Sequence, residues 1–138
     1  VSIRAQIINL FIMMKEKYHL TYLFITHDLL TARYIADRIA VMYLGCLVEL
    51  ASAKEIYENP LNPYTKALIS AISIPDVDKI KEKKRIELEG EIPSPIDKPS
   101  GCPFRTRCKY ATDKCKSSIP KLTEVKNSHF VACHRVDI

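Results

Sequence analysis

Four cysteines in the last third of the sequence have residue types that could bind a metal. Gaps of five, six and seventeen residues separate Cys102, Cys108, Cys115 and Cys133. These gaps are wider than the two to four residues common in structural zinc sites, and they match neither common ferredoxin pattern. Four thiolates suit a tetrahedral zinc ion or an iron–sulfur cluster. Because a cubane cluster is wider than one ion, the spacing favours [4Fe–4S]. Zinc, and a set of reduced or disulfide-paired cysteines, are the alternatives.

The residues around these cysteines are compatible with an anionic centre. Gly101 and Pro103 favour a turn around the first cysteine. His129 and His134 flank Cys133, but four cysteines already complete a ligand set. Cys46 is far away in sequence, and we expect it to be a buried apolar residue. Basic side chains that would offset the negative charge are Arg105, Arg107, Lys109, Lys114 and Lys116.

His27 is the second candidate for chemistry. It follows the apolar run "LTYLFIT" (20–26), which predicts a strand buried on both faces of a parallel sheet. In open α/β sheets, ligands bind beyond the carboxyl ends of such strands. An imidazole there can donate a hydrogen bond to a phosphate, although a capping or core-edge histidine is the alternative. We expect Asp28 to cap the helix that follows.

The elements that must position these residues follow an α-β-α order, which predicts a layered α/β fold. The pattern predicts a helix over 3–16 with one buried face, the strand 20–26 and a helix over 27–40. Residues 39–50 predict a β-hairpin around Leu44-Gly45. Helices over 52–60 and 62–72 have their own start signals: Ser52 with Glu55 in the first, and Asn62 with Pro63 in the second.

Beyond residue 74 the composition changes. Residues 75–85 are charged and read as a linker, and residues 85–101 predict a short strand followed by an extended Pro-rich loop. The 138 residues are 47% hydrophobic and 27% charged, which is ordinary for a globular protein. A net charge of +5 with its one cluster at 79–85 argues against a nucleic-acid-binding protein. No bilayer-length apolar run or signal peptide is seen, which favours metal over disulfides for the cysteines.

Three stretches carry a resemblance to a known family. "LTYLFITHDLLTARYIADRIAVMYLGCLVEL" (20–50) resembles the region around the switch histidine of ABC-transporter ATPases. "ASAKEIYENPLNPYTKALISAI" (51–72) is similar to the ATP-binding subunits of oligopeptide and dipeptide importers. "EGEIPSP", "CPFRTRC" and "VACH" resemble the C-terminal extension of the same subunits.

The resemblance implies an α/β fold: the C-terminal portion of a P-loop (RecA-like) ABC ATPase domain plus a small, loop-rich, Cys-containing extension. The nucleotide-binding part would span 1–74, a linker and Pro-rich segment 75–100, and the extension 101–138. His27 would contact the γ-phosphate of ATP. The four cysteines would correspond to those that hold a [4Fe–4S] cluster in some members.

The resemblance also implies partners: a second ATP-binding subunit and membrane permease subunits, at the cytoplasmic face of the cell membrane, with ATP and Mg²⁺ in the complete subunit. The sequence contains no G-x-x-x-x-G-K-[ST] phosphate loop, no signature and no Walker B residues. We therefore expect these 138 residues alone to be inactive as an ATPase. The alternative function is a stand-alone Cys-rich metal-binding or redox regulatory module.

A strand taken from a central sheet would expose an unpaired edge. If residues 20–26 form such a strand, a second copy of the chain is the candidate to cover it. The sequence thus raises a homodimer of this chain as a possible assembly.

Overall fold

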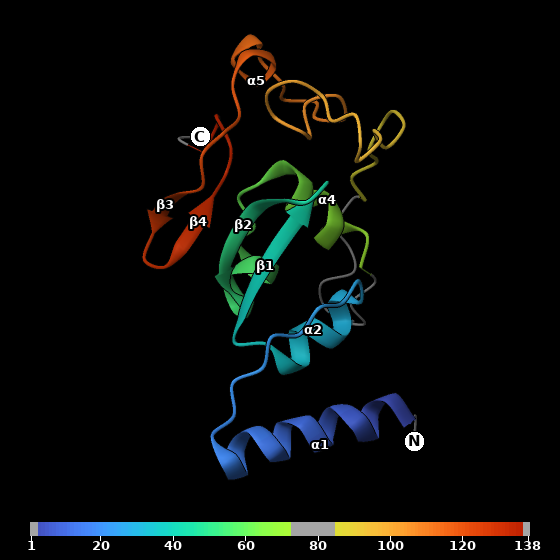
Figure 1. Ribbon diagram of the computed structural model, residues 1–138, viewed down its shortest axis with the longest axis vertical. Helices are drawn as coiled ribbons and strands as arrows, with labels where there is room; N and C mark the ends of the chain where they lie inside the picture. Colours follow the sequence, from blue (N-terminus) through green and yellow to red (C-terminus); the bar gives the residue numbers. More distant parts are fainter. Residues whose placement is uncertain (1–2, 73–84, 137–138) are drawn as a thin grey trace. The chain divides into compact units, whose positions relative to one another are not determined.

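The computed structural model describes residues 3–72 and 85–136 (Figure 1). The chain divides into two compact units, one up to Asp37 and one from Arg38 onward. It combines helices with an antiparallel sheet. The linker predicted over 75–85 lies almost wholly outside the described residues. Within the described part, no helix is both long enough and apolar enough to cross a bilayer.

The first unit contains two helices, α1 (Ile3–Tyr18) and α2 (Leu29–Ile35). The predicted first helix is confirmed, but none of its residues is buried, so the expectation of a buried face was wrong. Asp28 caps α2 as predicted, accepting hydrogen bonds from the backbone N–H groups of Leu30 and Thr31. The hydroxyl and backbone hydrogen bonds of Thr31 lower the pKa of Asp28, because they favour its carboxylate.

Two further predictions for the first unit were wrong. Residues 20–26 form no strand. A parallel strand needs hydrogen-bonded neighbours, and no described residue pairs with this run, so its apolar pattern is not enough. The predicted sheet edge is therefore not formed, and with it the reason for a homodimer disappears. The helix expected over 27–40 ends at Ile35, because strand β1 already begins at Arg38.

The second unit is built on a four-stranded antiparallel sheet with the order β1-β2-β4-β3. The predicted hairpin is confirmed as β1 (Arg38–Tyr43) and β2 (Cys46–Ser52). Leu44 (φ 47°) and Gly45 (φ 73°) form its two-residue turn, and both have the positive φ that a type I′ turn requires. Strands β3 (Thr123–Lys126) and β4 (His129–Val131) form a second hairpin, which pairs with β2 through β4.

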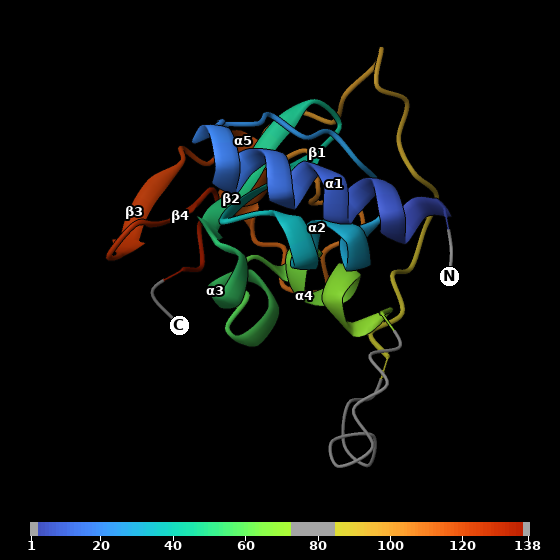
Figure 2. The same ribbon diagram turned by 90° about the horizontal axis from the view of Figure 1, so that it is seen from below.

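The described part of the second unit also contains three short helices. The predicted helices are confirmed as α3 (Ala53–Glu58) and α4 (Pro63–Ser70), capped by Ser52 and Asn62. Helix α3 packs against the β1–β2 hairpin (Figure 2). Helix α5 (Asp113–Ser117) lies in the cysteine-rich region, by which we mean residues 101–136. Residues 85–90 form no strand, contrary to the sequence prediction, because they have no pairing partner in the described sheet.

An aromatic cluster joins the hairpin, α4 and the cysteine-rich region. The ring centroids of Tyr43 and Tyr64 are 4.7 Å apart, and Phe104 lies 5.3 Å from both. Aromatic pairs at such distances favour edge-on and tilted contacts, as these are. Phe104 is 4% exposed and lies two residues after Cys102. The cluster therefore fixes the start of the cysteine-rich region on the hairpin.

The β1–β2 turn generates a stability prediction. Leu44 has a left-handed backbone, which costs a residue with a Cβ roughly 1–2 kcal/mol, and Asn tolerates it better. We expect Leu44→Asn to raise the free energy of unfolding by about 0.5–1 kcal/mol, measured by urea unfolding followed by circular dichroism. Leu44→Ala is the control, because it shortens the side chain without relieving the backbone. An Asn variant no more stable than the Ala variant would contradict the prediction.

Candidate functional site

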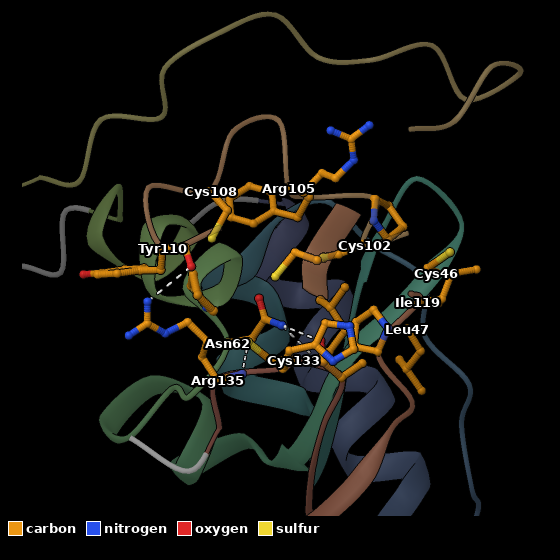
Figure 3. Close-up of a pocket in the computed structure, with 18 residues that line it drawn as sticks. Cys46, Leu47, Asn62, Cys102, Arg105, Cys108, Tyr110, Ile119, Cys133 and Arg135 are labelled. Carbon is orange, nitrogen blue, oxygen red and sulfur yellow. Dashed lines mark hydrogen bonds between the residues drawn. The ribbon is translucent and has the colours of Figure 1, made fainter. Parts of the chain in front are cut away.

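All four predicted cysteine ligands line one pocket, at which four segments of the second unit meet: 46–48, 62–63, 102–120 and 132–135. Figure 3 shows Cys102, Cys108 and Cys133 around it, with Cys46 at its edge. Cys115 is buried and the other three are half-buried, and all five cysteines of the chain are free thiols. The four cysteines that the sequence singled out thus lie around one pocket, and their role as metal ligands stays a prediction. The structure adds Cys46, which is half-buried instead of buried as expected and lines the same pocket.

A close backbone approach brings the first and third cysteines together. Gly101 has φ +68°, and a Cβ built on it would lie 2.3 Å from the carbonyl oxygen of Cys115. Only glycine fits such an approach without displacing the backbone. The backbone N–H of Cys102 then donates to that same carbonyl at 2.8 Å. The turn predicted around the first cysteine thus positions it directly against α5.

Asn62 positions the fourth cysteine. Its side-chain amide donates to the carbonyl oxygens of Val48 (3.4 Å) and Ala132 (3.2 Å), and its Oδ1 accepts from the backbone N–H of Tyr64 (2.9 Å). The backbone N–H of Ala132 donates to the carbonyl of Val48 at 2.9 Å. Asn62 therefore caps α4 and at the same time holds the residue before Cys133.

A buried carboxylate supports Asn62. The side chain of Glu49 is fully buried, and its oxygens accept hydrogen bonds from the backbone N–H groups of Leu61 (2.7 Å) and Asn62 (3.1 Å). The Nε2 of His129, which is 1% exposed, lies 2.7 Å from Glu49 Oε1. The Nδ1 of His129 has no hydrogen-bond partner, and it lies 3.7 Å from Glu55 Oε2. This network ties the loop between α3 and α4 to both hairpins.

The sequence prediction missed the roles of Glu49 and His129. The available signal was a carboxylate inside an otherwise apolar strand, since an ionised side chain is seldom buried unless it is paired.

The pocket environment disfavours free thiolates. Burial raises the pKa of Cys102, Cys108 and Cys133, and the neighbouring cysteines raise it further. Backbone N–H groups of Phe104 and Tyr110 hydrogen-bond the first two sulfurs and act in the opposite direction. These thiols are therefore protonated at neutral pH, and a metal that binds them must displace their protons.

The described residues do not form a closed single-ion site. Among residues 3–72 and 85–136, no group of three or more His, Cys, Asp or Glu side chains is arranged to hold a metal ion. The cysteines share a pocket, but they are not drawn together into the compact tetrahedron of structural zinc.

His27, the other predicted site residue, belongs to the first unit, where its side chain is exposed. It directly precedes the cap of α2, whose Asp28 N–H donates to Thr26 Oγ1 at 2.9 Å. The cysteines and the Glu49 network belong to the second unit, so these are two separate candidate sites.

Comparison with known proteins identifies relatives for almost all of the chain. Residues 48–115 match the family model described as oligopeptide/dipeptide transporter, C-terminal region. The oligopeptide transport ATP-binding protein AppF of Bacillus subtilis is 51% identical over 134 residues, which is 97% of this chain and 41% of AppF. The oligopeptide transport ATP-binding protein OppF of Haemophilus influenzae is 50% identical over 137 residues, covering 99% of this chain and 41% of OppF. The chain thus spans about two fifths of the length of these relatives.

The buried network generates the prediction for this site. In Glu49→Gln, an amide N–H₂ replaces one carboxylate oxygen and faces a hydrogen-bond donor, so one buried donor loses its acceptor. We expect the free energy of unfolding to fall by about 2–4 kcal/mol, measured by urea denaturation. Glu58→Gln, on an exposed side chain, is the matched control and should change stability by less than about 0.5 kcal/mol. Equal stabilities of the two variants would refute the role assigned to Glu49.

Proposed function

We propose that this chain serves as the C-terminal part of an ATP-hydrolysing subunit that powers peptide import, because it is similar to oligopeptide transport ATP-binding proteins over nearly its whole length. The observation that carries the proposal is the 51% identity to AppF over 97% of the chain. Residues 1–74 would belong to the P-loop nucleotide-binding domain and residues 101–138 to its cysteine-containing extension, with 75–100 connecting them.

In this proposal, His27 acts on the nucleotide in the complete subunit. An exposed imidazole beside a capped helix start is free to reach a phosphate contributed by another part of the protein. It would donate a hydrogen bond to the γ-phosphate of Mg-ATP and stabilise the charge that develops in phosphoryl transfer. The partners would be a second ATP-binding subunit and membrane permease subunits, at the cytoplasmic face of the cell membrane.

Substitution of His27 tests this role. In the complete subunit assembled with its partners, we expect His27→Ala to lower kcat for ATP hydrolysis by about 100-fold or more, because a charge-stabilising donor is lost. The matched control is His19→Asn, which replaces another exposed histidine by a residue that accepts its positive φ of 52°. A His27→Ala subunit that hydrolyses ATP at the rate of the His19→Asn subunit would refute the assignment.

The four cysteines are proposed to hold a [4Fe–4S] cluster, with zinc as the alternative metal. Their donor set fits, because four thiols line one pocket, and the backbone N–H of Arg135 already donates to Cys133 Sγ at 3.4 Å. Four cysteine sulfurs spread around a pocket favour a wide cluster over one compact ion. When bound, the cluster would supply a rigid cross-link between residues 102–115 and β4, or a redox-sensitive one.

Anaerobic purification followed by metal and sulfide analysis tests the cysteine site. We expect a brown protein with about four irons and about four sulfides per chain. We expect Cys115→Ser to lose most of the iron, while Cys46→Ser retains it, because Cys46 lies outside the proposed ligand set. A colourless protein with about one zinc per chain would identify the bound metal as zinc instead of iron. A protein without metal, or equal losses in both variants, would overturn the metal proposal.

A further inference from the structure

Each of the four proposed ligand sulfurs has its own hydrogen-bond partner. Three of the donors are backbone N–H groups placed two residues after the cysteine: Phe104 for Cys102, Tyr110 for Cys108, and Arg135 for Cys133. The fourth sulfur is that of Cys115, and its partner is a side chain instead. The hydroxyl oxygen of Thr112 lies 3.5 Å from Cys115 Sγ. Thr112 is therefore the one partner of this set whose hydrogen-bonding group a substitution can remove.

Thr112 does not do what its position predicts. It is the N-cap of α5, where a threonine hydroxyl normally accepts a hydrogen bond from the first turn of the helix. Ser52 and Asn62 do this for α3 and α4, at 3.2 and 2.9 Å. Thr112 makes no side-chain cap hydrogen bond, although its backbone is extended as a cap requires. Its hydroxyl hydrogen-bonds the Cys115 sulfur instead of a backbone N–H of the helix.

The burial of the sulfurs explains why the fourth one needs this donor. Cys115 is 7% exposed, whereas the other three cysteines are half-buried and accessible to water. A thiolate only accepts hydrogen bonds, so the charge on a buried sulfur depends on donors from the protein. A hydrogen bond from a hydroxyl to an ionised acceptor is stronger than one between neutral groups.

We propose that Thr112 is a positioning residue of the cysteine site, whose hydroxyl donates to the Cys115 thiolate, fixes its sulfur toward the pocket and stabilises the metal-bound form. This inference rests on the proposed metal function of the pocket. In the metal-free thiol, the hydrogen bond can also run the other way, with the Cys115 S–H group donating to Thr112 Oγ1. Release of the thiol proton on metal binding leaves the hydroxyl as donor and the thiolate as acceptor.

The test compares three variants of the whole chain, purified anaerobically with metal bound. Thr112→Val keeps the shape and removes the hydroxyl, while Thr112→Ser keeps the hydroxyl. Thr123→Val is the matched control, since the hydroxyl of Thr123 serves only a backbone carbonyl, that of Val131 at 3.5 Å. The measured quantity is the rate at which the metal is lost to excess chelator, with the melting temperature of each metal-free protein as a check on folding.

We expect Thr112→Val to lose metal about tenfold faster than the wild type, or faster still, as is usual when a hydrogen bond to a metal ligand is removed. Thr112→Ser and Thr123→Val should lose it at the wild-type rate. The metal-free melting temperature of Thr112→Val should match that of Thr112→Ser, because no helix cap is lost. Metal loss from Thr112→Val at the wild-type rate, or equal acceleration in Thr112→Ser, would overturn the inference.

The wild type separates this inference from the function on which it rests. A wild-type protein without metal refutes the proposed cysteine site, and the role of Thr112 falls with it. A wild-type protein that binds metal, with a Thr112→Val variant that retains it equally well, refutes the role of Thr112 alone.

Discussion

The buried carboxylate of Glu49 is the constraint on which the second unit depends. Its oxygens accept hydrogen bonds from two backbone N–H groups of the loop before α4, and Nε2 of His129 lies within hydrogen-bond distance. One side chain of β2 thereby bonds the loop before α4 and β4. Because a buried carboxylate without hydrogen-bond donors is costly, Glu49 and the three groups that contact it must fold together. The cysteine-rich region is consequently part of the same folded body as the β1–β2 hairpin, and it is not an appended tail.

The same arrangement ties the cysteine pocket to the hairpin and to α4 within the second unit. Asn62, whose backbone is bonded by Glu49, holds the carbonyl before Cys133, and Phe104 packs on Tyr43 of the hairpin. A change in the geometry of the cysteine pocket would therefore displace residues of β1, β2 and α4 that contact it directly. In the proposed subunit, those elements would belong to the nucleotide-binding part, and these contacts would link that part to the cysteine pocket.

The sequence predicted those features that depend on interactions between neighbouring residues, which are the helix caps and the hairpin turn. The caps by Asp28, Ser52 and Asn62 and the two-residue turn at Leu44-Gly45 depend on neighbours within a few residues, and all were predictable. The strand expected over 20–26 needed pairing partners that no local pattern can supply. The four cysteines were recognisable as a set from residue type. The contacts that position them, through Gly101 and the Glu49–His129 pair, join residues far apart in sequence. These contacts could not be predicted from the sequence.

The pairing of β2 with β4 also governs the order in which the second unit folds. It joins Glu49 to Val131 and Leu50 to Phe130, about 80 residues apart, and contacts so distant in sequence form slowly. Cys102, Cys108 and Cys115 can gather early, because short turns and α5 connect them. Cys133 reaches them only after β4 has docked. Under the proposed metal function, the thiols of the nascent chain would stay open to oxidation until β4 has docked and the fourth cysteine completes the set.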